Sequence, residues 1–520
     1  MKYPMTHLHF SFANLGAGGL FSTAGLSLCT IVLSGLMGCN VGPKYVRPEV
    51  LAPPAFKELG PQNASDGTTW KPAQPQDATQ RGKWWEIYQE PELNALEEKL
   101  NISNQNIAQA FDNFMAARAQ VQQARSNYYP TVSVGPSYAR NRSSQSQTSG
   151  SNSSHSNTNP NSNLFNLPLD VSWEPDLWGR IRNTVRQNVN AAQVSAADLE
   201  NQRLTEQADL AAFYFELRGQ DALEELYQKT VEVDRQALEL TRVLYKTGLD
   251  NDEAVAQAEI ALKSTEAAAT NAGIARAQDE HAIALLVGEP ASTFSVPIKP
   301  LITEVPRIPV GIPSELLERR PDVAGAERKM AEANALIGVE KAAYYPTLSI
   351  TGAVGFEASQ FSKWLTSPSR YWSVGPTASE TIFDGGLRKS TMAQYAALYD
   401  ADVAGYKQTV LTAFQQTEDS LASLRLLTQQ IEQQQEAVAS AQRNVDVASA
   451  RYRTGLDPYL NVFTAQSTLL TNQQTAITLR VQQITSSVQL IESLGGGWDV
   501  TQLPSEKAVT AKSPEQIESY

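Results

Sequence analysis

Residues 452–466 read YRTGLDPYLNVFTAQ, and a related stretch, YKTGLDNDEAVAQAE, occupies residues 245–259. At one constant offset, the chain repeats Tyr245, Thr247, Gly248, Leu249 and Asp250 as Tyr452, Thr454, Gly455, Leu456 and Asp457. Glycine ends helices because it reaches positive φ without a Cβ clash. The aspartates suit the N-cap of a following helix, and Pro458 suits its first position. Each copy predicts a tight turn between two long antiparallel helices, as a plain hairpin turn or as a duplicated functional site.

The segment before the first turn has the period of a very long helix. Its small and apolar residues return at steps of three and four, as in Ile181, Val185, Val189, Ala192, Ala196 and Leu199. We expect this helix to reach Lys246, with at most one break, and a return helix over 251–287. A helix of roughly 70 residues would be about 100 Å long, which exceeds the needs of a globular core.

Between the helices, two pairs of segments change to the period of a β-strand. In the first pair, 131–138 and 165–174, apolar residues alternate with polar ones, as in Phe165, Leu167, Leu169, Val171 and Trp173. The second pair is expected at 347–357 and 371–383. About ten residues suit a tilted strand that crosses a bilayer, with Trp173 in its interfacial girdle. A soluble hairpin is the alternative, but it would be marginal without partners.

The order of these patterns occurs twice. Tyr-Tyr-Pro ends an early helix in each half, at 128–130 and 344–346, and each half reads helix, two strands, long helix, turn, shorter helix. We therefore divide the chain into a signal peptide (1–38), an extended tether (39–90), a first structural repeat (91–289), a crossover (290–313), a second repeat (314–498) and a flexible C-terminal tail (499–520).

The N-terminus predicts a lipid anchor. The first 38 residues carry one charged side chain, Lys2, and end in Leu-Met-Gly before Cys39. This pattern is typical of a bacterial lipoprotein signal, after which the Cys39 thiol is acylated, for example with palmitate. A transmembrane anchor helix is the alternative. Asn40 fits export to the outer membrane, and no later run of 18 apolar residues predicts a membrane helix.

Composition argues against several classes of function. The chain has 55 acidic and 42 basic residues and a net charge of -13, whereas nucleic-acid binding favours a basic face. Of four histidines, His7 and His9 fall in the signal and His155 in a Ser/Asn-rich loop, which leaves only His281 on a helix. We therefore expect no enzyme, no catalytic residue, no metal site and no cofactor besides the covalent lipid.

The strands also predict an assembly. Four strands per chain cannot close a barrel, and open sheet edges are not tolerated in lipid. Three chains would supply twelve strands, an even number within the range of outer-membrane barrels. The expected fold is mainly α with a small β part: a homotrimeric α-helical tunnel joined to a 12-stranded transmembrane barrel.

Several motifs resemble the TolC-like outer membrane factors, specifically the lipoprotein (NodT-type) branch that serves resistance–nodulation–division efflux systems. They span residues 39–498, in family order: Cys39, Val41-Gly42-Pro43-Lys44-Tyr45, Arg47-Pro48, Trp84-Trp85, Trp173-Glu174-Pro175-Asp176-Leu177-Trp178-Gly179-Arg180, Arg319-Arg320-Pro321-Asp322, Tyr345-Pro346 and Leu494-Gly495-Gly496-Gly497-Trp498.

The resemblance implies a passive exit duct in the outer membrane of a Gram-negative bacterium, extending into the periplasm. A periplasmic membrane-fusion adaptor would dock on the tips at Tyr245, Gly248, Leu249, Asp250, Tyr452, Gly455, Leu456 and Asp457, and an inner-membrane transporter would drive export. In the family, a Leu, an Asp and an Arg occupy the gate positions that match Leu460, Thr464 and Ser467. Here the leucine is kept and hydroxyl groups replace the two charged groups, so the resemblance implies an apolar constriction and does not support a charged ring at this level.

Three alternatives stay open. Asp250 and Asp457 could be N-caps or could form, with Asp252, a negative entrance that favours cations. A lipid-anchored coiled-coil envelope protein or adhesin would explain the anchor and the long helices, but not the strands or the repeat. A type I secretion duct shares the expected fold. The sequence does not name the cargo.

Overall fold

The computed structural model describes residues 40–49, 52–59, 82–142, 161–301, 303–308, 310 and 313–511. Cys39 and the expected signal peptide lie outside this part of the chain. The described residues form two compact units: a β unit of residues 40–42, 130–180 and 341–382, and a helical unit of the other described residues. Among the helices described, none combines the length and apolar content needed to span a membrane.

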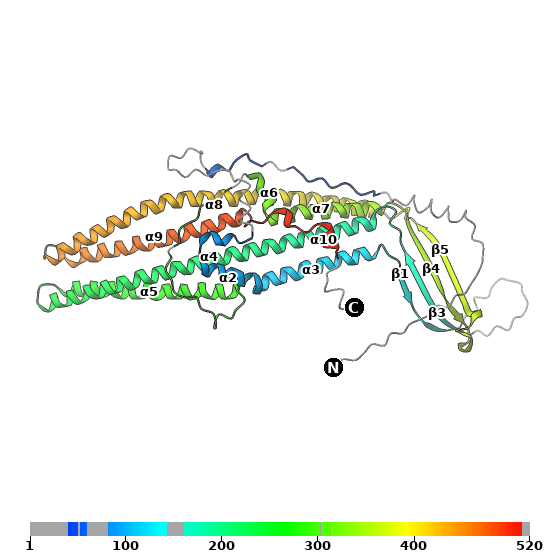
Figure 1. Cartoon of the computed structure of the whole chain (residues 1–520), viewed down its shortest axis with the longest axis horizontal. Helices are drawn as coiled ribbons and strands as arrows, with labels where there is room; N and C mark the ends of the chain where they lie inside the picture. Colours follow the sequence, from blue (N-terminus) through cyan, green and yellow to red (C-terminus); the bar gives the residue numbers. More distant parts are fainter. Residues whose placement is uncertain are drawn as a thin grey trace, which may run out of the picture. The chain divides into compact units, whose positions relative to one another are not determined.

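The helical unit is built from two long hairpins (Figure 1). One consists of α4 (Arg180–Lys246) and α5 (Asp252–Leu286), and the other of α8 (Leu387–Arg453) and α9 (Tyr459–Ser493). Both long helices have 67 residues and both return helices have 35. The two predicted long helices and their return helices are confirmed, and α4 runs without a break.

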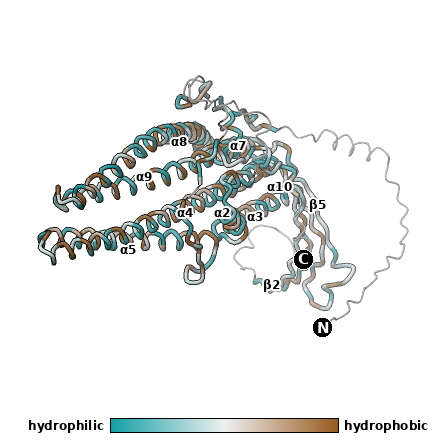
Figure 2. The backbone as a smooth tube through the Cα atoms, turned by 60° about the vertical axis from the view of Figure 1, so that its left-hand side comes forward, coloured by the Kyte–Doolittle hydropathy of each residue, from teal (hydrophilic) through white to brown (hydrophobic). Residues whose placement is uncertain are grey.

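Small residues let these helices pack closely. The buried positions of α4 include Ala192, Ala196 and Ala197, and the α5–α9 contact buries Ala258 and Ala465. Polar and apolar residues alternate along the helices (Figure 2), so each helix buries only a stripe. The hairpins are therefore amphipathic, and much of their surface is polar.

The sequence analysis assigned one helix before each Tyr-Tyr-Pro, but the structure divides both of these segments into shorter helices. Helix α2 (Pro91–Ser103) ends at Asn104, whose side chain accepts hydrogen bonds from the first amides of α3 (Gln105–Ser126). In the second half, η5 (Pro313–Glu315) and α6 (Leu316–Arg319) precede α7 (Pro321–Ala342). Asn104 makes a local cap, and Pro321 disfavours a helical conformation at the residue before it.

The main hydrophobic core lies where the shorter helices meet α4 and α9. The 3₁₀-helix η3 (Trp84–Tyr88) inserts its aromatic side chains here, and Trp84, Trp85 and Tyr88 are buried. They join Tyr214 and Phe215 from α4, which are fully buried. These residues therefore pack in the core, although the sequence analysis assigned residues 39–90 to an extended tether.

Parts of the expected tether and tail lie against the helices. In the N-terminal segment, the Tyr45 hydroxyl donates to Glu327 at 2.6 Å, and Phe56 is buried. At the other end, η8 (Val500–Gln502) and α10 (Glu506–Thr510) follow α9, with Val509 fully buried against α3. The expectation of a flexible tail is wrong for residues 500–511, because Val509 provides an apolar anchor.

The β unit is an antiparallel sheet in the order β1-β3-β4-β5. The strands are β1 (Thr131–Val134), β2 (Ser137–Arg142), β3 (Asn161–Trp173), β4 (Thr347–Ala358) and β5 (Arg370–Ser379). Val134 pairs with Leu169 and Ser137 with Asn166, so β2 continues the register of β1 beyond Gly135 and Pro136. The last strand ends at Ser379, short of the predicted 383.

The register divides the sheet into two faces of opposite character. One face, which we call the apolar face, carries Val132, Val134, Tyr138, Phe165, Leu167, Leu169, Val171, Trp173, Ile350, Val354, Phe356, Trp372 and Val374. The other, the polar face, carries mainly serine, threonine and asparagine with Asp170 and Glu357. On the apolar face Trp372 is 75% exposed and Val374 68% exposed, so this chain alone leaves much of that face uncovered.

Candidate functional site: the helical tips

The two predicted tip turns have the same backbone structure. Gly248 has φ 72° and Gly455 has φ 73°. The Leu249 amide donates to the carbonyl of Leu244, and the Leu456 amide donates to that of Arg451, both at 2.9 Å. These bonds close each helix in the manner expected for a glycine in the left-handed region. The prediction of two equivalent glycine turns is confirmed.

The tip leucines contribute little to the packing of this chain. Leu249 is 77% exposed and Leu456 is 69% exposed, and Tyr245 is also exposed. The two tips therefore present equivalent apolar side chains that this chain does not cover. Behind the tips the hairpins pack together through a small cluster that includes Leu238, Leu262 and Val462.

The capping roles expected for the tip residues are wrong. The N-cap of α5 is Asn251, whose side chain accepts a hydrogen bond from the Ala254 amide at 2.9 Å. The N-cap position of α9 is Pro458 itself, one residue before the first helical position, and no side chain caps this helix. Asp250 and Asp457 are instead free to make other contacts.

Asp250 links the two hairpins. The hydroxyl of Tyr452 donates to Asp250 Oδ2 at 2.7 Å, which ties the tip of α8 to the turn between α4 and α5. Burial and this hydrogen bond raise the pKa of Tyr452 to about 12, so the hydroxyl keeps its proton at neutral pH. Tyr452 also packs edge-on against Tyr459, with ring centroids 5.4 Å apart.

Asp457 forms an ion pair within its own turn. Both of its carboxylate oxygens accept from Arg451, at 2.6 and 3.0 Å. The hydrogen bond from the Arg451 guanidinium lowers the pKa of Asp457, so its carboxyl is ionised at neutral pH. Because the guanidinium offsets this charge, Asp457 adds little to a negative entrance.

The three predicted gate residues lie along one side of α9. Leu460, Thr464 and Ser467 are all exposed in this chain, with Leu460 47% exposed. The Thr464 hydroxyl donates to the carbonyl of Leu460 at 2.8 Å, so part of its polarity is satisfied within the helix. Ser467 borders a pocket of about 280 Å³ between the hairpins.

Asp234 shares this pocket with Ser467, and the sequence analysis missed it. It projects from α4, is 3% exposed, and accepts a hydrogen bond from Thr265 at 2.8 Å. Burial raises the pKa of its carboxyl. A signal existed, because Asp234 falls between Val231 and Leu238 at the seam spacing of three and four, where an apolar residue is expected.

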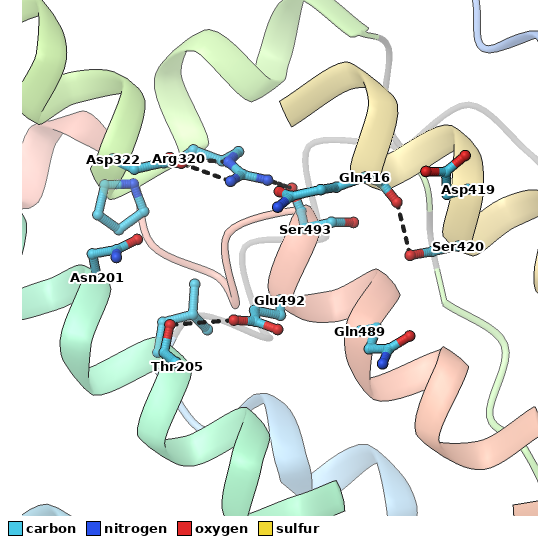
Figure 3. Close-up of a pocket in the computed structure, with 12 residues that line it drawn as sticks. Asn201, Thr205, Arg320, Asp322, Gln416, Asp419, Ser420, Gln489, Glu492 and Ser493 are labelled. Carbon is cyan, nitrogen blue, oxygen red and sulfur yellow. Dashed lines mark hydrogen bonds and ion pairs between the residues drawn. The ribbon is translucent and has the colours of Figure 1, made fainter. Parts of the chain in front are cut away.

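One of the motifs that resemble the family, Arg-Arg-Pro-Asp, forms a structural junction away from the tips (Figure 3). Arg320 donates to both oxygens of Asp322, at 3.0 and 2.7 Å, and to the carbonyl of Ser493 at 3.0 Å. These contacts tie the start of α7 to the end of α9 beside a polar pocket of about 470 Å³. The Arg-Arg-Pro-Asp motif therefore stabilises the helical unit and takes no part in the tips.

The comparisons with known proteins identify the class. Residues 96–289 and 312–496 match the family of outer membrane efflux proteins. This match covers more than half of the chain, so the chain belongs to that family.

Individual members of this family align with nearly the whole of this chain. The solvent efflux pump outer membrane protein SrpC of Pseudomonas putida is 31% identical, with 92% of this chain and 99% of the relative covered. The probable efflux pump outer membrane protein TtgC of the same species is also 31% identical, covering 89% and 93%. The solved outer-membrane channel OprN is 29% identical with a TM-score of 0.78, covering 88% of this chain and all of that one.

The protein is thus an outer membrane efflux channel of the kind found in tripartite pumps. This identification confirms the predicted family, function and outer-membrane location. It decides against the lipid-anchored coiled-coil envelope protein or adhesin. The predicted mainly helical fold with a small sheet is confirmed too.

Proposed function

We propose that three copies of this chain form a passive exit duct through which a resistance–nodulation–division transporter, joined by a periplasmic adaptor, exports small molecules. The observation that carries this proposal is the pair of equivalent hairpin tips, each with an exposed leucine, on a chain whose sheet leaves an apolar face uncovered. Relatives named for solvent and antibiotic efflux support small organic molecules as cargo.

The sheet supports a barrel wall shared among chains. Because β1 and β2 lie in line beside β3, the five strands occupy four positions across the sheet. The sheet has two edges, formed by β1 with β2 on one side and by β5 on the other. Unpaired strand edges cannot remain in lipid. Edge-to-edge pairing of three copies would give a 12-stranded barrel, with the apolar face toward lipid and the polar face toward the lumen.

The helices support an internal two-fold repeat. The lengths of α4 and α8 agree, as do those of α5 and α9, and the glycine turns between them have matching hydrogen bonds. A repeat would let one chain present two similar tips. A homotrimer would then offer six docking positions to adaptors, one for each hairpin.

The contacts at the tips support a closed resting state. Separation of the α8–α9 hairpin from the α4–α5 hairpin would break the hydrogen bond from Tyr452 to Asp250. In the trimer Leu460, Thr464 and Ser467 would line the narrow end of the duct. Because these side chains are uncharged and Asp457 is paired with Arg451, the gate would be apolar and hydroxylic, and only Asp250 and Asp252 would favour cations at the entrance.

The test of the proposed function replaces the tip leucines. The double variant Leu249→Asp and Leu456→Asp should abolish pump-dependent drug resistance, because charge at an apolar docking contact opposes binding. Heat-modifiable trimers and single-channel conductance in planar bilayers should remain as in the wild type. The matched control is Leu285→Asp, which changes an equally exposed leucine at the far end of α5.

Two results would contradict the proposal. Full resistance in the tip variant would remove the docking role. A wild-type protein that forms neither trimers nor conducting channels would remove the duct itself.

Lipidation of Cys39, with palmitate among its acyl chains, is a separate part of the proposal. Cys39→Ser should leave a protein that still assembles into trimers but incorporates no labelled palmitate and is released more readily from membranes, because stable anchoring then depends on the barrel alone. Normal palmitate labelling of this variant would refute the anchor.

A further inference from the structure

The apolar face of the sheet ends in arginines. Arg140 and Arg142 follow Tyr138 at intervals of two along β2, so all three side chains belong to the same face. On the opposite edge of the sheet, Arg370 begins β5 and pairs with Phe356 of that face. The three arginines thus lie at the loop end of the sheet, where β2 leads to β3 and β4 leads to β5.

Along both edge strands an aromatic side chain of the same face stands between the arginines and the aliphatic residues: Tyr138 precedes Arg140 in β2, and Trp372 follows Arg370 in β5. The ring of Phe165 lies 4.7 Å from that of Tyr138, 5.6 Å from that of Phe361 and 5.8 Å from that of Trp364. Phe361 is 71% exposed although it belongs to this cluster. Aromatic belts of this kind mark the level at which a barrel leaves the hydrocarbon and meets the lipid headgroups.

The described strands offer these arginines no acidic partner on their face. Within the described strands the acidic residues are Asp170 and Glu357, and both belong to the polar face. Arg140 and Arg142 are exposed and form no ion pair within the described residues. Among the described residues, the Arg370 guanidinium donates to Ser367 alone, at 2.6 Å to its hydroxyl and 3.3 Å to its carbonyl. Three positive charges therefore remain available to an external anion.

We propose that Arg140, Arg142 and Arg370 bind the phosphate groups of lipid headgroups in the outer leaflet. The inference rests on the proposed barrel, because it needs the apolar face to contact lipid. Guanidinium groups recognise phosphate with paired N–H donors, and long arginine stems let the charge extend from an apolar surface to the headgroup level. The other ends of β1, β3, β4 and β5 lead directly into the helical unit, so the loop end is the outer one in a duct with periplasmic helices.

The experiment measures how much phosphorylated lipid stays with the channel. Full-length protein is reconstituted into phosphatidylcholine nanodiscs that contain bisphosphorylated lipid A, and bound lipid A per trimer is measured by native mass spectrometry. The variant R140Q/R142Q/R370Q should retain roughly tenfold less lipid A, since each charge-assisted hydrogen bond contributes more than a neutral one. Monophosphorylated lipid A should show a smaller difference between variant and wild type.

Two controls separate this effect from general loss of charge or of folding. K229Q/R235Q/K263Q removes three exposed cations from the helices and should retain lipid A like the wild type. R140K/R142K/R370K keeps the charge and should retain an intermediate amount, because lysine lacks the paired donors. All variants should conduct like the wild type in planar bilayers.

The outcomes distinguish the two levels of inference. Channels of normal conductance that retain equal lipid A with and without the three arginines would overturn the lipid site and leave the duct intact. Equal loss in the helix control would also overturn it, because the effect would then be one of net charge. A wild type without channel activity would overturn the proposed duct and the lipid site together.

Discussion

Tyr452 and Asp250 show what single residues in a sequence can and cannot disclose. Both belong to the repeated turns, so the sequence identified them as tip residues, yet their hydrogen bond joins different hairpins. Such a contact depends on how α4, α5 and α8 pack, which no local pattern describes. Asp234 is a different case: its spacing from Val231 and Leu238 placed it on the buried side of the helix, but the neighbours of its carboxyl come from α5 and α9 and were not predictable.

Asp234→Asn should make the folded protein more stable at neutral pH. The pKa of the buried carboxyl is raised above its unfolded-state value, which is about 4. The carboxyl of Asp234 therefore lowers the free energy of unfolding more and more as pH rises from the unfolded-state pKa to the folded-state pKa. The full loss of stability is present above both pKa values. Asparagine can still accept from Thr265 but never ionises, so the gain should be about 1–3 kcal/mol at pH 7 and vanish near pH 4.

Thermal unfolding followed at several pH values checks this expectation. Asp446→Asn, at an exposed position of α8, is the control and should shift the unfolding temperature little at any pH. If the unfolding temperatures of Asp234→Asn and the wild type differed by the same amount at every pH, burial of this carboxyl would have no energetic consequence.

The helices and strands were largely predictable because their signals are periodic and long. Ile181 through Leu199 repeats often enough to predict a helix, and the alternation from Phe165 to Trp173 is a clear strand signal. Ends and caps were less predictable, because Asp250 and Asn251 are both good N-caps and only the backbone path selects Asn251. Helix α10 has five residues, too few for any period, so its docking through Val509 gave no sequence signal.

The glycines after α9 show how an element's end can be fixed by a close contact. Gly495 has φ 93°, and a Cβ at this position would overlap the carbonyl oxygen of Arg319. Gly495→Ala should therefore destabilise the protein by more than about 3 kcal/mol, since backbone strain and a clash with backbone add together. Loss of the helical circular dichroism signal on heating measures this.

Gly385→Ala is the matched control, because Gly385 also has positive φ, 64°, but a Cβ there would have open space around it. Only the conformational cost remains, about 1–2 kcal/mol. Similar unfolding temperatures for the two variants would mean that the contact between Gly495 and Arg319 is not what holds the end of α9.

The assembly is the feature least predictable from one sequence, because other copies of the chain and lipid cover the surfaces that this chain leaves exposed. Val374 and Ser373 are neighbours in β5, yet the register gives them opposite faces: Val374 pairs with Gly352 and Ser373 with Ala353. The sequence analysis predicted a strand here but did not assign its two faces. It did not disclose what covers the apolar one, since lipid and partner chains lie outside the chain itself.

This pair of neighbours provides the sharpest test of the barrel. Val374→Arg should cost about 2–4 kcal/mol and leave few heat-modifiable trimers, because it places a charge against lipid near the middle of a strand. Ser373→Arg adds the same charge to the polar face, so trimers should form and only their conductance and ion selectivity should change. The fraction of trimer on gels and the conductance in planar bilayers measure both. If the two variants assembled equally well, the apolar face would not contact lipid, and the sheet could not be the wall of a membrane barrel.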